Sequence, residues 1–226
     1  MPEEFISVGK CLYCNQAFSQ KDIARHLKTH LTAQQKKVPS PDVVYHLKVE
    51  AGVYFLQLLV KGCAEFESLD DFLRDIWVDC CQHMSGFNSK TDEIEMEDTL
   101  EAVLVPKMKF TYDYDYGTTT TLDLAVVGIY QMAMEEEILL LSRNEPLKIM
   151  CSLCEKEPAV FLCAAHGYMI DEFLFCKGCG KKHKKVCEEF DDYASMPVVN
   201  SPRMGECGYE GGSIDVERDG AYKTPK

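Results

Sequence analysis

The sequence lacks long apolar runs, and it has a single tryptophan and few basic residues. Its 226 residues carry 24 Lys/Arg against 37 Asp/Glu, which gives a formal net charge of −13. No apolar run reaches the ~20 residues that a membrane-spanning helix needs. The opening MPEEFISVGK has no apolar stretch typical of a signal peptide. These absences argue against a membrane protein, a secreted protein and a general nucleic-acid coat protein, and we expect a cytoplasmic location.

The scarce basic charge is concentrated in two segments. Residues 1–50 carry seven Lys/Arg against five Asp/Glu, and residues 148–187 carry seven against four. Residues 51–147 carry only six against nineteen, and the tail from 188 onward carries four against nine. A polyanionic partner would therefore be met by the two basic segments and repelled by the middle of the chain.

Cysteine is abundant, with twelve in the chain. In a reducing compartment, paired C-x2-C spacings predict metal sites in place of disulfides. Both basic segments contain such pairs, so the metal prediction and the charge prediction fall on the same parts of the sequence.

The first basic segment contains CLYCNQAFSQKDIARHLKTH, with the spacing C-x2-C-x11-H-x3-H. A tetrahedral zinc site can take two thiolates from a knuckle and two imidazoles from one helix face, which four-residue spacing supplies. Phe18, Ile23 and Leu27 would form the small core. This segment resembles the two-Cys/two-His zinc finger, although its Cys–His gap is one residue shorter than the usual twelve. We assign residues 1–36 to a finger with the ligands Cys11, Cys14, His26 and His30.

Nucleic-acid contact by this finger is a separate prediction. Counting back from His26, the base-facing positions would be Ser19, Asp22 and Arg25, and Lys21 and Lys28 could touch phosphates. One finger covers about 3 bp, which is too little for tight binding alone. The alternative is that the finger docks a protein or only fixes the N-terminal segment.

The second basic segment contains eight possible ligands spaced C-x2-C-x8-C-x2-H-x9-C-x2-C-x3-H-x3-C. Eight ligands suffice for two four-coordinate zinc ions. The four pairs could be joined in sequence, or the first could share an ion with the third and the second with the fourth. The pair spacings resemble cross-brace modules of the RING, B-box and MYND kind, which favours the interleaved arrangement. The ligands would be Cys151, Cys154, Cys163, His166, Cys176, Cys179, His183 and Cys187.

The reason for metal in this module, residues 148–190, is energetic. About 40 residues with few large apolar groups cannot bury enough surface to fold unaided. A structural zinc contributes on the order of 10 kcal/mol. Together with the finger, this module predicts about three zinc ions per chain. An alternative is a single zinc held by Cys151, Cys154, Cys176 and Cys179. Four lysines between the last ligands could contact nucleic acid: Lys181, Lys182, Lys184 and Lys185.

The middle of the chain, residues 43–147, predicts an α+β domain: a small sheet with helices on one face, flanked by the two zinc modules. Residues 53–62 have the β-rich apolar composition of a strand, and residues 67–87 have apolar residues at helical spacing. KMKFTYDYDYG at 107–117 and TTTTLDLAVVG at 118–128 predict a hairpin, and a short helix is expected within 91–104.

A family resemblance covers roughly residues 52–212. It rests on LDDFLRDIWVDCCQHMSGF, KFTYDYDYGTTTTLDL and the tail MPVVNSPRMGECGYEG. Together they resemble the plasmid pRiA4b ORF-3-like family, which is also met as insertion-element passenger proteins. The resemblance implies the α+β fold and an association with mobile genetic elements. A branch of the family carries D-x-W after its YDFG-like motif, where this chain has Thr118–Thr120, so a role tied to that Asp or Trp does not carry over.

Three further predictions concern a possible active site, the cysteines outside the quartets and the tail. An enzyme would use His83, Asp113, Asp115 and the hydroxyls of Thr118–Thr121, but a hydrogen-bonded core histidine is the commoner role for His83. Cys80 and Cys81, adjacent on the expected helix, would point apart and make a poor ligand pair, and Cys207 would be surplus to the filled sites. The tail, residues 191–226, predicts a packed loop followed by a disordered end.

The leading functional prediction is a zinc-binding, non-enzymatic adaptor or accessory protein. It would contact DNA or RNA, or a protein partner, through its zinc modules. The alternatives are a purely protein-binding module and an enzyme built on the YDYDYG–Thr hairpin with His83.

Overall fold

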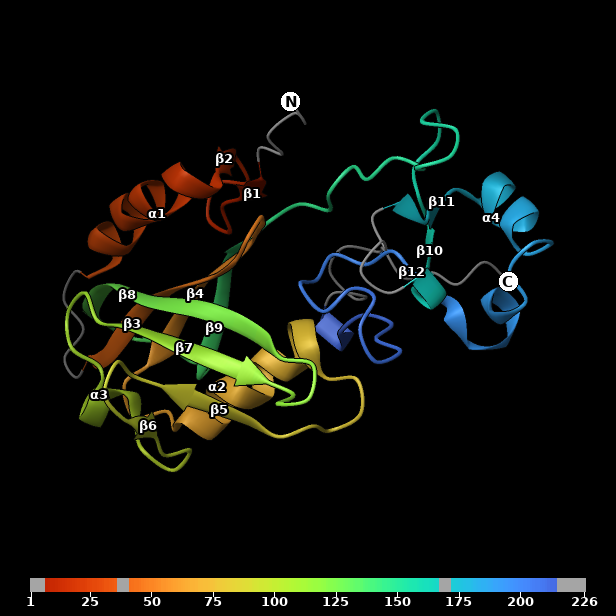
Figure 1. The fold of residues 1–226 in the computed structure, drawn as a ribbon. Helices are drawn as coiled ribbons and strands as arrows, with labels where there is room; N and C mark the ends of the chain where they lie inside the picture. The colour runs from red at the N-terminus through yellow and green to blue at the C-terminus, as the bar shows by residue number, and fades with distance from the viewer. Residues whose placement is uncertain (1–6, 36–40, 167–171, 215–226) are drawn as a thin grey trace. The chain divides into compact units, whose positions relative to one another are not determined.

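The computed structural model of the chain describes residues 7–35, 41–166 and 172–214. The chain forms two compact units. The first unit is Met1–Arg74 with His83–Glu145, and the second is Asp75–Gln82 with Pro146–Lys226. Figure 1 shows the elements of both units, and each unit is described separately below.

The first unit is built on a seven-stranded antiparallel sheet with the order β6-β5-β7-β8-β3-β4-β9. A register shift between His46 and Leu47 interrupts one of the strand pairings. The strands are β3 (Asp42–Ala51), β4 (Tyr54–Lys61), β5 (Ser85–Asn88), β6 (Glu93–Ile94), β7 (Lys109–Tyr114), β8 (Thr120–Met132) and β9 (Ile138–Arg143).

One face of this sheet is covered by the helix α2 (Phe66–Leu73), whose buried side chains recur at helical spacing. The ring of Phe66 contacts those of Phe87 and Phe110, with centroids 5.1 and 6.0 Å apart. The π-helical segment η1 (Arg74–Val78) continues the helix, and a short helix α3 (Leu100–Val103) follows later. The single helix expected over 67–87 is wrong in its extent, because the helical backbone ends at Val78 and β5 occupies the last residues of that range.

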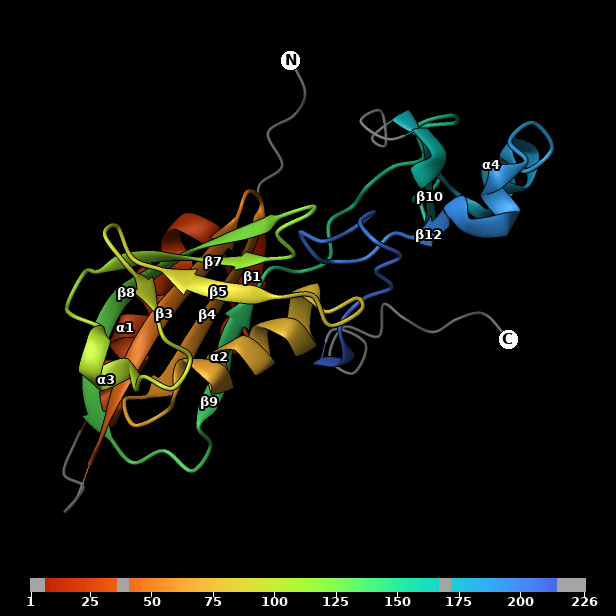
Figure 2. The ribbon, with the colours of Figure 1, turned by 60° about the horizontal axis from the view of Figure 1, so that its bottom comes forward.

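The opposite face of the sheet is covered by the N-terminal segment. It consists of β1 (Val8–Lys10), β2 (Ala17–Ser19) and α1 (Gln20–Gln34). Figure 2 shows α1 and α2 on the two sides of the sheet. The apolar stripe of α1 packs into the same buried cluster as residues of β3, β4, β8 and β9. The finger therefore shares its hydrophobic core with the sheet. The cluster includes Ile23, Leu27, Leu31, Val44, Leu59 and Leu141.

The predicted α+β class is confirmed. The strand expected at 53–62 is β4, and the expected hairpin is β7 with β8, paired from Lys109↔Ala125 to Tyr114↔Thr120. The short helix expected within 91–104 is α3. Strands β3 and β9 are not among the predicted elements.

The second unit contains a small sheet with the order β11-β10-β12. Its elements are β10 (Phe161–Cys163), β11 (Leu174–Phe175), α4 (Lys177–His183), η3 (Phe190–Ala194) and β12 (Ser195–Pro197). Five of its cysteines are buried with Phe175 and Phe190 in one cluster, and the partly buried Cys154 packs against it. Thiols thus occupy the place that aliphatic side chains take in an ordinary core.

The segment after β12 packs onto residues 75–82 of the same unit. Ser201, Arg203 and Tyr209 are buried, and the Ser201 hydroxyl donates to the Trp77 carbonyl at 2.6 Å. The packed loop of the predicted tail lies here. The disordered end is predicted to follow Gly212, and of that segment residues 215–226 lie outside the described residues. Among the helices in the described ranges, none is long and apolar enough to cross a membrane.

Candidate metal centres

The N-terminal ligand set is assembled by a knuckle and a helix. The knuckle turns because Asn15 has a left-handed backbone (φ 57°), which lets its N–H donate to the Cys11 carbonyl at 2.8 Å. On α1, His26 and His30 lie one turn apart, so both rings project from one side of the helix. One donor atom each from Cys11, Cys14, His26 and His30 lies within 4.8 Å of the others.

Two separations within this set are close to those of a tetrahedron around one ion. Cys14 Sγ lies 3.2 Å from His26 Nε2, and the Nε2 atoms of His26 and His30 are 3.2 Å apart. Metal–nitrogen bonds of about 2.0–2.1 Å and metal–sulfur bonds of about 2.3 Å give tetrahedral edges of about 3.3–3.8 Å. The two measured separations lie just below this range, so the four residues can hold a metal ion after small adjustments.

In the second unit, the first C-x2-C pair repeats the same knuckle. Glu155 is left-handed (φ 53°), and its N–H donates to the Cys151 carbonyl at 2.9 Å. The partner pair, Cys176 and Cys179, begins α4, where Cys176 is the N-cap residue and its sulfur accepts from the Cys179 N–H. These two pairs form one group: Cys151, Cys154, Cys176 and Cys179.

The remaining two pairs form the other group of this unit. Cys163 is the last residue of β10, and His183 is the last residue of α4. The Cys187 N–H donates a hydrogen bond to the His183 carbonyl, and this bond positions the Cys187 thiol. Cys163, His166, His183 and Cys187 have one donor atom each within 4.8 Å of the others. The pairs therefore group in the interleaved arrangement, first with third and second with fourth.

Sulfur separations in both groups fit metal ligation. Cys154 Sγ and Cys176 Sγ are 3.9 Å apart, and Cys163 Sγ and Cys187 Sγ are 3.8 Å apart. A disulfide requires about 2.05 Å, whereas two thiolates on one tetrahedral zinc are separated by about 3.8 Å. All twelve cysteines of the chain are free thiols.

The thiols of the first group differ in how readily they ionise. Burial opposes ionisation of Cys151, but backbone N–H groups of Cys176, Cys154 and Leu153 outweigh it and lower its pKa to about 6. Burial and neighbouring thiols raise the pKa of Cys179 to about 12. Several thiolates can coexist in so small a volume when a bound cation neutralises their charge.

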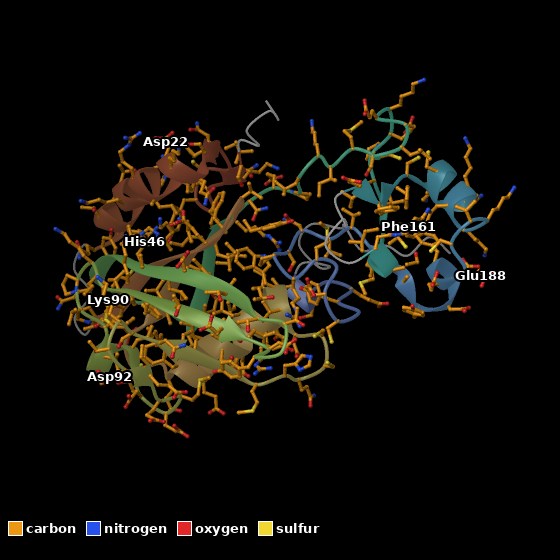
Figure 3. The ribbon with its side chains drawn as sticks, viewed as in Figure 1. Asp22, His46, Lys90, Asp92, Phe161 and Glu188 are labelled. Carbon is orange, nitrogen blue, oxygen red and sulfur yellow. The ribbon has the colours of Figure 1, made fainter. Side chains whose placement is uncertain are left out.

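The residues predicted to contact nucleic acid are exposed in both units. Lys21, Arg25 and Lys28 lie on α1, away from its buried stripe. Arg25 pairs with Asp22 at 2.5 Å, and the Ser19 hydroxyl donates to the same carboxylate at 2.7 Å. Two of the three expected base-facing side chains thus bond to the third, Asp22, which Figure 3 labels on α1.

The four lysines around His183 are also exposed. Their surroundings are mixed in charge, because Lys184 forms an ion pair with Asp191 of η3. The expected cationic surface is therefore partly neutralised by the Asp191 carboxylate.

The candidate catalytic residues Asp113 and Asp115 form hydrogen bonds with residues of the β7–β8 hairpin and its neighbouring strand. Asp113 accepts from the Thr121 hydroxyl at 2.5 Å and from the Asn88 amide at 3.1 Å. Asp115 is buried, accepts from the Gly117 N–H and lies 3.5 Å from His83 Nε2. His83 lies beyond the end of the helical segment and its side chain is partly exposed, so it is not the core histidine that the sequence favours.

The chain is thus an α+β protein, and each of the three predicted Cys/His quartets is able to hold a metal ion. No protein-family model matches the chain, and no curated protein matches it. A solved structure that resembles it is a protein of unknown function, MM3350, from Methanosarcina mazei Go1. The identity is 17% and the TM-score 0.39, over 46% of this chain and 68% of that one.

Proposed function

We propose that the chain is a zinc-stabilised, non-enzymatic binding protein that contacts nucleic acid through its two metal modules. The observation that carries this proposal is the coincidence of closed Cys/His quartets with exposed basic rows on the same helices, α1 and α4. The resemblance of residues 52–212 to the pRiA4b ORF-3-like family adds an expected association with mobile genetic elements.

Zinc is the metal that suits these sites best. Thiolate and imidazole donors in tetrahedral sets favour zinc over magnesium or calcium, which take oxygen ligands. Four protein ligands leave no coordination position for substrate, as in structural zinc sites. We therefore assign the ions a structural role, in which they stabilise the finger and the thiol-rich core of the second unit.

Contact with nucleic acid is supported by the position of the charges. Lys21, Arg25 and Lys28 recur at i, i+4 and i+7, so they share a face of α1 while Ile23 and Leu27 are buried on the sheet. A row of cations on a helix held rigidly by its opposite face can follow a phosphate backbone. The lysines of the α4 region would add contacts of the same kind.

A protein partner is the second candidate function, and it is favoured by exposed apolar side chains on the second unit. Val186 is 81% exposed, Tyr193 72% and Leu153 61%. Large apolar side chains that remain in water often mark a protein-binding surface when they gather in one patch. This candidate uses the same unit and needs no nucleic acid.

The two candidates can be separated by titrating duplex DNA and a matched RNA duplex at ~50 mM and ~200 mM salt. We expect binding at the lower concentration and a steep loss at the higher one. The triple variant K21A/R25A/K28A should reduce the salt slope by about three, because each lost phosphate contact removes about 0.9.

The matched control is K90A/K107A/K109A, which removes the same charge from exposed positions of the acidic middle. It should bind like the unmodified protein. Absence of binding at ~50 mM salt, or equal loss in both triple variants, would remove nucleic acid from the proposal and leave the protein partner.

A further inference from the structure

Three cysteines outside the predicted quartets come together in the second unit. Cys80 and Cys81 follow η1 in a bend, because the helical backbone ends at Val78. Cys207 lies 126 residues further along, on the packed loop after β12. The premise that Cys80 and Cys81 sit on a helix and point apart is therefore wrong, and Cys207 is placed beside them.

The loop holds Cys207 in this place by several independent contacts with residues 75–82. Besides the bond from Ser201 to the Trp77 carbonyl, Gly212 lies so close to the backbone of Asp75 and Ile76 that an added Cβ would collide with it. Cys207 itself has a left-handed backbone (φ 47°), followed by Gly208 (φ 69°). This pair of unusual conformations directs the turn that carries the thiol.

The three sulfurs have the spacing of ligands on one ion. Cys80 Sγ and Cys81 Sγ are 3.8 Å apart, Cys81 Sγ and Cys207 Sγ are 3.7 Å apart, and all three lie within 4.8 Å of one another. These separations are close to the 3.9 and 3.8 Å found in the two quartets of the same unit. They fit the tetrahedral edge of about 3.8 Å expected for zinc thiolates.

A buried cation accompanies the group. Arg203 is fully buried, and its Nη2 donates to Cys80 Sγ at 3.7 Å. A buried guanidinium beside a sulfur favours the thiolate, which is the form that binds metal. Three thiolates and one neutral ligand around a divalent ion carry a net charge of −1, which this guanidinium would offset.

We propose that Cys80, Cys81 and Cys207 bind a further structural zinc ion. The three thiols are assigned from their geometry within the second unit. A neutral fourth ligand would complete the tetrahedron around the ion. The ion joins the loop after β12 to the segment that follows η1.

The test is the zinc content of the full-length protein, purified under reducing conditions and analysed by inductively coupled plasma mass spectrometry. We expect about four zinc ions per chain, and about three in Cys207→Ser and in Cys81→Ser. The matched control is Cys63→Ser, which alters another exposed cysteine outside every group and should leave the content at about four.

Substitution by cobalt provides a second readout that does not depend on counting. The ligand-field spectrum of the Co²⁺-loaded protein should lose one thiolate-rich component in Cys207→Ser, while circular dichroism stays unchanged. The proposal is overturned if Cys207→Ser retains the zinc content and cobalt spectrum of the unmodified protein. A disulfide between Cys81 and Cys207 that persists in the folded protein purified under reducing conditions would overturn it as well.

Discussion

His46, a buried histidine of β3, should make the stability of the first unit depend on pH. Its side chain is fully buried on the side of the sheet that α1 covers, and Figure 3 labels it. Its Nε2 is 2.7 Å from the Gln57 Oε1, and its Nδ1 has no hydrogen-bond partner among the described residues. A second proton would therefore reside on Nδ1 in an apolar environment.

The size of the effect follows from the pKa. Burial lowers the pKa of His46 to about 4, and the hydrogen bond with Gln57 opposes this shift only in part. In the unfolded chain a histidine has a pKa of about 6.5. Between these values the unfolded state binds more protons, so the unfolding free energy decreases as the pH falls. The decrease is about 2 kcal/mol between pH 7 and pH 5, and about 3 kcal/mol when complete.

The assay is urea unfolding, followed by far-UV circular dichroism, of the unmodified protein and His46→Gln across this pH range. Acid also protonates metal ligands, but that loss is common to both proteins, so the difference between them isolates His46. The difference in unfolding free energy should change by about 2 kcal/mol from pH 7 to pH 5. A difference that stays constant with pH would refute the reasoning.

Two other substitutions test the packing of the first unit. Leu27→Ala should lower the unfolding free energy of the whole unit by about 2–5 kcal/mol, because Leu27 is fully buried between α1 and the sheet. The control Lys28→Ala, on the exposed side of α1, should change the unfolding free energy by less than about 0.5 kcal/mol. Tyr112→Phe removes a hydroxyl that donates to the buried Asp70 at 2.7 Å, and it should cost about 1–3 kcal/mol in the same urea assay. An unchanged unfolding midpoint in Leu27→Ala would show that the finger folds independently of the sheet.

The ligand quartets could be predicted from the sequence because their spacing encodes local geometry. A C-x2-C pair followed by a turn, and histidines one helical turn apart, place donors correctly wherever the segment lies. The interleaved grouping was favoured by the spacing, and the fold brings Cys151 to Cys176 in that arrangement. The sharing of one core by α1 and the sheet was not predicted, because the same stripe of Ile23 and Leu27 also fits the small core of an isolated finger.

Other parts of the fold depend on information that a local pattern does not contain. Strand β3 does alternate, with apolar residues at 43, 45, 47 and 49, and this signal could have identified it. The helix after Phe66 ends at Val78 although apolar spacing continues to Cys80, since the chain leaves the helix to enter β5. The meeting of Cys207 with Cys81 spans most of the chain, so no local spacing predicts it.

Native mass spectrometry of the freshly purified, reduced protein tests the central claim most directly, because it measures bound metal and thiol state on the same molecule. We predict a mass that exceeds the chain by at least three zinc ions, with every quartet cysteine reduced on subsequent denaturation. Two results would contradict the account. One is a folded protein whose mass equals that of the bare chain, and the other is a chain whose mass is reduced by the hydrogens lost when quartet cysteines form disulfides.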